Sequence, residues 1–169
     1  YENFKPYYVR YWSNSVPIKD ISEALRNQLE DAGLHEQKMV IIGHSMGGLV
    51  SRSLMIENSF TKGISKNKRC GENVDLLITL GTPHHGSPMA NGPARNAKVN
   101  LLLHITMLAV EASLFKETKY NEVNRSNLLW DNYDDLLNLQ KYPNEKNNWL
   151  VDLNMATQYD AKTICYSGA

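Results

Sequence analysis

The stretch VIIGHSMGGLV, residues 40–50, constrains the fold most, because it sets Ser45 at the centre of Gly43-His44-Ser45-Met46-Gly47. The apolar run MVII, residues 39–42, precedes the serine, and MGGLVSRSLMIEN follows it with the pattern of a helix. This context predicts a sharp strand-to-helix turn with an exposed serine at its tip. The glycines avoid Cβ collisions in such a turn, and Gly48 lets the helix pack closely on the sheet. The other interpretation is that Ser45 only caps a helix.

Strand and helix patterns alternate along the chain on both sides of this turn. YYVRYW at residues 7–12, VDLLITL at 74–80 and, more weakly, KTICYSG at 162–168 are predicted strands. Residues 19–33 predict a helix that Asp20 caps and Gly33 ends. The unbroken apolar run before Ser45 fits a strand buried on both faces. The order predicts an α/β fold, a mostly parallel sheet with helices on both faces.

Composition narrows the class of protein further. The 169 residues suit one domain, and 42% hydrophobic with 21% charged residues predicts a folded core. A formal net charge of zero gives no basic excess, so nucleic acid is not an expected partner. Two cysteines are too few for a disulfide scaffold, and Cys165 is expected to be a buried free thiol. No targeting segment or membrane-spanning run is visible, which leaves a cytoplasmic and a secreted location both open.

Two motifs resemble a known family. VIIGHSMGGLVSR resembles the nucleophile elbow of the α/β-hydrolases, in the lipase and esterase branch. LLITLGTPHHGSP, residues 76–88, is similar to the strand and loop that follow the elbow helix in bacterial triacylglycerol lipases and inositol-deacylase-like lipases. The resemblance covers about residues 7–90 and implies an α/β-hydrolase fold. It also implies that Ser45 is the nucleophile, that the Met46 N–H donates to the oxyanion, and that the loop after Leu80 borders the site.

A long segment interrupts the alternation between Gly86 and Trp149. It far exceeds an ordinary connection, so residues 86–148 are predicted to be an inserted helical lid on a hydrolase core of residues 1–85 and 149–169. Within it, VNLLLHITMLAVEASLF, residues 99–115, is strongly apolar. This segment predicts either a lid helix that covers an acyl pocket and contacts a lipid surface, or an ordinary buried helix.

A serine nucleophile needs a base and an acid, which the fold supplies in the order serine, acid, histidine. Asp75 begins a strand and would lie roughly 15–20 Å from the catalytic edge, which excludes it. His35 precedes the nucleophile strand and is at the wrong edge, and His44 is expected to pack beside Ser45. The insertion's aspartates and Asp152 are expected to be surface charges.

The remaining candidates border the pocket without completing a triad. These are Thr82, His84 and His85 in the loop after residue 80, and His104 in the insertion. An unusual arrangement with one of these histidines as base stays open. We expect instead that the chain is an internal piece of a longer hydrolase, with its acid, its base and its second oxyanion donor elsewhere. Without an earlier strand, residues 39–42 would have an exposed edge.

These patterns predict a serine hydrolase that cleaves carboxylic esters through an acyl-enzyme on Ser45. The expected partner is an ester or lipid substrate, and no metal or organic cofactor is implied by the residues. Two alternatives stay open: a non-catalytic protein of this fold that binds a partner or lipid, and an acyltransferase that uses the same nucleophile.

Overall fold

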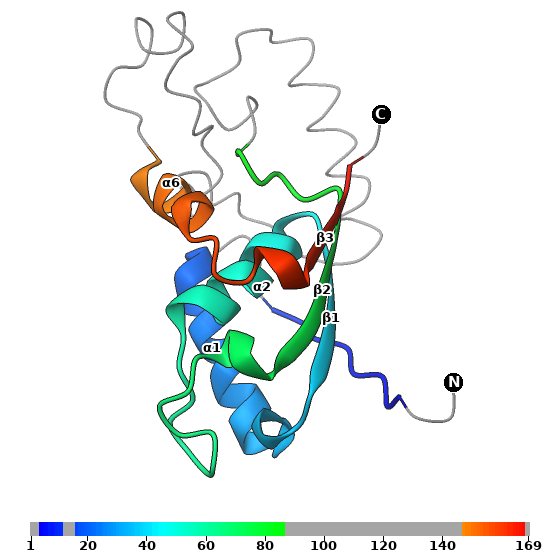
Figure 1. Ribbon diagram of the computed structural model, residues 1–169, viewed down its shortest axis with the longest axis vertical. Helices are drawn as coiled ribbons and strands as arrows, with labels where there is room; N and C mark the ends of the chain where they lie inside the picture. Colours follow the sequence, from blue (N-terminus) through cyan, green and yellow to red (C-terminus); the bar gives the residue numbers. More distant parts are fainter. Residues whose placement is uncertain (1–3, 12–15, 87–146, 168–169) are drawn as a thin grey trace, which may run out of the picture.

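The computed structural model of the protein describes residues 4–11, 16–86 and 147–167 (Figure 1). Its helices and strands alternate as expected. They are α1 (Ile18–Asp31), β1 (Met39–His44), α2 (Met46–Glu57), β2 (Val74–Leu80), α6 (Asn148–Met155) and β3 (Thr163–Tyr166). Short 3-10 turns (Leu34–Glu36, Cys70–Asn73 and Asp160–Lys162) lead into the three strands.

The described strands form one parallel sheet in the order β1-β2-β3. His44 pairs with Leu80, and Leu80 pairs with Tyr166, so all three strands end at the same level. The loop after each strand therefore emerges at one edge of the sheet, where α/β folds place their ligand sites. Ser45 follows β1 directly, and the loop from Gly81 to Gly86 follows β2.

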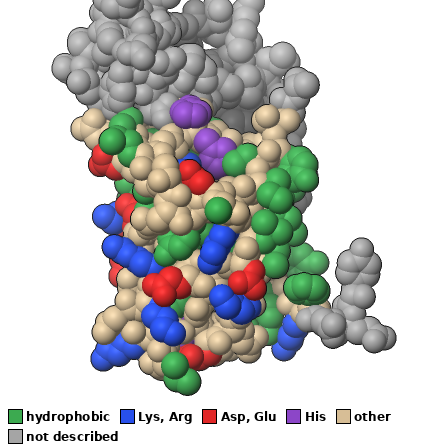
Figure 2. All heavy atoms as spheres, in the orientation of Figure 1, with side chains coloured by type: hydrophobic (Ala, Val, Ile, Leu, Met, Phe, Trp, Pro, Cys, Tyr) green, Lys and Arg blue, Asp and Glu red, His purple; other side chains and the backbone are tan. Residues whose placement is uncertain are grey.

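The described helices lie on one side of this sheet (Figure 1). Apolar side chains follow the other side in the space-filling view (Figure 2). Val40, Ile42, Ile164 and Tyr166 are 45%, 66%, 44% and 59% exposed there. The prediction that β1 is buried on both faces is therefore wrong within the described residues, because no described element covers this face and β1 is an edge strand. Helices on the second face stay a prediction.

The core lies between α1, α2 and α6. Its members are nearly or completely buried: Ile18, Ile21, Leu25, Leu49, Val50, Leu54, Phe60, Cys70, Leu150 and Leu153. The spacing of Ile21 and Leu25 by one helical turn puts both on the face of α1 that packs on α2. Trp149 packs at the margin of the core, and its indole N–H donates to the carboxylate of Glu57 at the end of α2.

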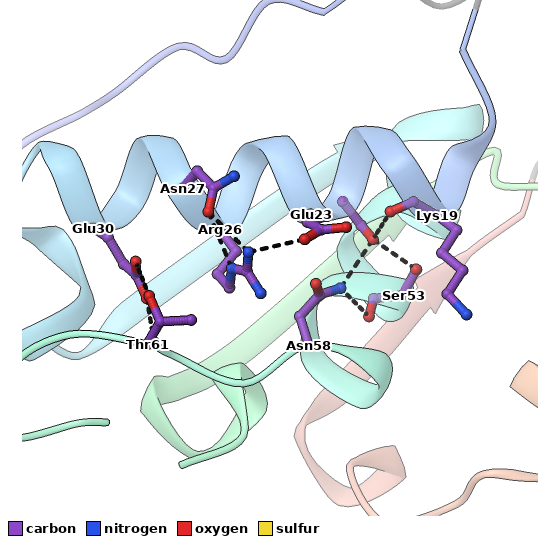
Figure 3. A network of polar contacts seen from close by, with 9 residues as sticks. Lys19, Glu23, Arg26, Asn27, Glu30, Ser53, Asn58 and Thr61 are labelled. Atoms are coloured by element: carbon purple, nitrogen blue, oxygen red, sulfur yellow. Dashed lines mark hydrogen bonds and ion pairs between the residues drawn. The ribbon is translucent and has the colours of Figure 1, made fainter. Parts of the chain in front are cut away.

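Buried polar groups fix α1 against α2 and the segment that follows it (Figure 3). The Asn58 amide donates to Ser22 Oγ of α1 over 3.0 Å and to the Ser53 carbonyl of α2 over 3.2 Å. Glu30, 5% exposed, accepts from the backbone N–H of Thr61 and, over 2.7 Å, from its hydroxyl. Satisfied polar pairs of this kind specify how the helices meet.

Several boundaries differ from the sequence prediction. Residues 7–11 form no strand, because they pair with no described strand. Helix α1 begins after Pro17, so Asp20 lies inside its first turn and is not the cap. Cys165 is a free thiol but an exposed one, because β3 is an edge of the described sheet. Gly33 has a φ of 68° just past the end of α1, as its role as a helix stop requires.

The predicted lid lies almost wholly outside the described residues, which omit 87–146, and with it the apolar segment 99–115. The division into a core and an inserted lid therefore stays a prediction. Within the described residues, no helix is both long and apolar enough to cross a membrane.

Candidate active site

Ser45 occupies the turn between β1 and α2 with φ 52° and ψ −129°. Among the described residues, only Ser45 and Asn67 combine a side chain with positive φ. Such a conformation costs about 1–3 kcal/mol and persists only where the surroundings enforce it. Here the Ser45 N–H donates to the Leu80 carbonyl over 2.9 Å, and its own carbonyl accepts from Gly48 over 3.1 Å. The serine is exposed at the carboxyl edge of the sheet.

The glycines around Ser45 allow the backbone to fold this tightly. A Cβ on Gly43 would lie 2.7 Å from the Gly48 Cα and 2.8 Å from the Gly48 nitrogen, so β1 and α2 meet at van der Waals distance there. A Cβ on Gly48 would lie 2.1 Å from Thr82 Oγ1. A Cβ on Gly47 would lie 3.1 Å from the Tyr11 hydroxyl. The sequence spacing of these glycines thus has a steric cause.

Met46 is the first residue of α2, directly after the serine. The N–H groups of a helix's first turn have no acceptor within the helix, and the helix dipole makes that end favourable for negative charge. The position of Met46 is compatible with the predicted role of its N–H as an oxyanion donor, which stays a prediction.

His84 lies in the loop after β2 and is half-buried. Its Nε2 lies 3.0 Å from Thr79 Oγ1 and 3.4 Å from Cys165 Sγ, and its Nδ1 lies 3.3 Å from Arg52 Nη1. A guanidinium can only donate, so Nδ1 accepts and the ring proton sits on Nε2. Among the described residues these partners occupy both ring nitrogens, and none of them is Ser45.

Burial above all, together with the nearby charges of Arg52 and His85, lowers the pKa of His84 from 6.5 to about 4. A base for Ser45 must accept a proton near neutral pH and must reach the hydroxyl. In this structure the pKa of His84 lies well below neutral, and its ring nitrogens contact Thr79, Cys165 and Arg52, which hold the loop in place. The alternative that kept His84 as base is therefore not supported by the geometry.

Of the other candidates, His35 and Asp75 lie away from Ser45, whereas His44 and His85 lie at the same edge of the sheet as the serine. His35 is buried before β1 and packs on Phe60, at the opposite end of the sheet from Ser45. Asp75 pairs with Lys38 over 3.2 Å at that same end. His44 is the exposed last residue of β1, and His85 is exposed in the next loop. His104 lies outside the described residues.

Three polar residues around His84 were not singled out from the sequence. Arg52 of α2 donates to Asn154 Oδ1 of α6 over 2.6 Å and to the Leu153 carbonyl over 3.0 Å. Asn154 in turn donates to the His84 carbonyl over 2.7 Å. Thr79, 1% exposed, lies under the imidazole. A signal existed only for Arg52, which falls two helical turns after Ser45 in VIIGHSMGGLVSR.

The described residues contain no group of three or more histidine, cysteine, aspartate or glutamate side chains that could hold a metal ion. The polar groups at the carboxyl edge include the exposed Ser45 and the hydrogen-bonded cluster around His84. This arrangement suits nucleophilic attack with electrostatic stabilisation of an anion.

Known proteins resemble this chain in sequence and in fold. Protein SERAC1 of Danio rerio is 27% identical over 86 residues, which cover 47% of this chain and 13% of that protein. Phospholipase PlaB from Legionella pneumophila, solved with thio-NAD, is 19% identical with a TM-score of 0.55 over 95% of this chain and 28% of that chain. Lipase BlEst2 of Bacillus licheniformis, in its mature form, is 19% identical with a TM-score of 0.50 over 90% of this chain and 48% of that chain.

The two solved structures establish a shared α/β-hydrolase fold, and the chain spans less than half the length of each of these three proteins. The model of one family covers residues 15–124, which include the elbow, the helices around it and the loop after β2. The chain belongs to the family of PGAP1-like alpha/beta domains.

Proposed function

We propose that this chain carries the nucleophile of a serine hydrolase that cleaves carboxylic esters through an acyl-enzyme on Ser45. The observation that carries the proposal is the strained φ of 52° at Ser45, enforced between β1 and α2 by close backbone packing. Strain of this kind is kept where a reactive group needs exposure. The lipase and phospholipase named among the structural neighbours support an ester or lipid substrate.

In the proposed reaction, a histidine outside the described residues takes the Ser45 proton while Oγ attacks the ester carbonyl carbon. The carbonyl π electrons move to oxygen, and the Met46 N–H and a second donor stabilise the oxyanion. The C–O bond to the alcohol breaks, and the histidine returns its proton to the leaving oxygen. Water, activated by the same histidine, then releases the acid and regenerates Ser45.

Labelling with a fluorophosphonate probe tests the proposal on the natural full-length protein. We expect one labelled serine, complete loss of label in Ser45→Ala, and parallel loss of hydrolysis of p-nitrophenyl esters. Ser59→Ala is the matched control, because Ser59 lies past the other end of α2, where it bridges to Arg69. Retained label in Ser45→Ala contradicts the proposal.

A non-catalytic protein of the same fold is the second candidate. The observation that favours it is that, within the described residues, Ser45 has no histidine partner. A folded full-length protein that neither labels nor hydrolyses short esters would support this candidate. An acyltransferase would label normally but would transfer the acyl group to an added alcohol or thiol faster than to water.

A further inference from the structure

We infer that Arg52 is a positioning residue for Ser45, which acts by clamping the loop Gly81–Gly86 between α2 and α6. The inference rests on the function proposed above, since it names how the nucleophile is held. Three side chains carry it, namely Arg52, His84 and Asn154, called here the loop clamp. In the sequence, Arg52 lies 32 residues from His84 and 102 residues from Asn154, and His84 lies 70 residues from Asn154.

The clamp closes as a ring of hydrogen bonds. Arg52 Nη1 donates to His84 Nδ1 over 3.3 Å and to Asn154 Oδ1 over 2.6 Å. The Asn154 amide donates to the His84 carbonyl over 2.7 Å. Both the side chain and the backbone of His84 are thus fixed by groups outside its own loop. A third bond from Arg52, from Nη2 to the Leu153 carbonyl over 3.0 Å, holds the end of α6 in the same arrangement.

The clamped loop touches the nucleophile turn directly. Thr82, two residues before His84, packs against Gly48. A Cβ on Gly48 would lie 2.1–2.8 Å from three side-chain atoms of Thr82. The Leu80 carbonyl, immediately before the loop, accepts the Ser45 N–H over 2.9 Å. Movement of His84 would therefore be transmitted over a few residues to the backbone that keeps Ser45 in its strained conformation.

The surroundings of Arg52 indicate that its contribution is the arrangement of its hydrogen bonds and not an ion pair. Within the described residues its hydrogen bonds to His84, Asn154 and Leu153 go to neutral acceptors, and no carboxylate lies within ion-pair distance of it. Burial lowers its pKa, the sign of a partly desolvated cation. An apolar side chain would pack α2 on α6 without this cost. Only a planar, multidentate donor satisfies His84, Asn154 and Leu153 together.

The test uses the natural full-length protein with Arg52→Met, Arg52→Lys and Asn154→Asp. Three quantities are measured for each: the fluorophosphonate labelling rate, kcat and KM for a two-carbon ester, and amide exchange of the Gly81–Gly86 peptide. We expect Arg52→Met to lower the labelling rate and kcat roughly 10–100-fold with little change in KM, because small misplacements of a nucleophile cost this much. Exchange of the loop should rise about tenfold while α1 is unchanged.

The conservative variants separate positioning from folding. Arg52→Lys keeps the charge but cannot reach all three acceptors, so its kcat should lie between those of the wild type and Arg52→Met. Asn154→Asp keeps an acceptor for Arg52 and removes the donor to the His84 carbonyl, so its loop exchange should rise. Arg26→Met is the control: Arg26 of α1 pairs with Glu23 over 3.1 Å, and its loss should leave labelling unchanged.

Two results overturn the inference. One is a folded Arg52→Met protein with a lower denaturation midpoint but wild-type labelling and wild-type loop exchange, which would make Arg52 purely structural. The other is a fall in labelling as large in Arg26→Met as in Arg52→Met. If the wild type neither labels nor hydrolyses esters, the proposed function fails, and loop exchange alone decides whether Arg52 positions the loop.

Discussion

The contact between Gly48 and Thr82 predicts a strong energetic coupling. Gly48→Ala would place a methyl 2.1 Å from Thr82 Oγ1, 2.7 Å from Cγ2 and 2.8 Å from Cβ. Oγ1 and Cγ2 can rotate with χ1, but Cβ moves only with the backbone. Overpacking costs about 1–3 kcal/mol, and helix propensity returns at most about 1 kcal/mol near a helix end. We expect a net cost of about 2 kcal/mol, or roughly 4–8 °C in Tm for a chain of this size.

Shortening Thr82 should relieve this cost in steps. In a Thr82→Ala background, Cβ remains at 2.8 Å and part of the penalty stays. In a Thr82→Gly background all three atoms are gone, and Gly48→Ala should become neutral or stabilising by up to about 1 kcal/mol. The resulting coupling is about 2–3 kcal/mol, at the upper end for contacting residues. Thr82 Oγ1 has no hydrogen-bond partner among the described residues, so its removal itself breaks no hydrogen bond.

The assay is urea-induced unfolding of the six proteins that combine Gly or Ala at 48 with Thr, Ala or Gly at 82. Equal m-values would show that the unfolded ensemble is comparable across the set. Labelling of Ser45 should follow the same order, because the contact lies beside the nucleophile turn. If Gly48→Ala costs the same in all three backgrounds, the packing of the loop on α2 is not as described.

Two further predictions concern the core and the loop histidine. Leu54→Ala should cost about 2–5 kcal/mol in urea unfolding, because Leu54 is completely buried between the helices, whereas Met155→Ala, at a site 77% exposed, should cost under about 0.5 kcal/mol. The pKa of His84 is about 4 in the fold and near 6.5 when unfolded, so the unfolded chain binds more protons between these values. Stability should therefore fall as pH drops from about 6.5 toward 4, and His84→Asn should flatten that slope in unfolding curves at pH 7 and pH 5.

The nucleophile turn could be predicted from sequence because its requirements are local. A buried-type strand, a serine flanked by glycines and a helical segment all fall within residues 39–57. The structure places β1 at Met39–His44 and α2 at Met46–Glu57, with Ser45 alone between them. Helix α1 and strand β2 followed from short-range periodicity in the same way.

Errors arose where the outcome depends on which distant segment supplies a partner. YYVRYW has strand propensity, yet a strand needs a neighbour to bond, and residues 7–11 have none among the described strands. Cys165 lies in an apolar run, yet it is exposed because β3 is an edge. Propensity reports what a segment can form, whereas burial depends on tertiary contacts that propensity does not contain.

The loop clamp and the outer face of the sheet are opposite cases of this dependence. The apolar pattern of β1 predicts that both faces of the strand are buried. In the described residues only the face that carries Ile41 packs on the core, and Val40 and Ile42 on the other face are exposed. The loop clamp shows the opposite case. The local sequence around Arg52 and Asn154 does not predict that they interact, yet in the fold both contact the loop Gly81–Gly86. A polar residue recruited across such distances restricts how the nearby backbone can move. For this reason, substitution of Arg52, rather than of any histidine in the described residues, should lower activity more than it lowers stability.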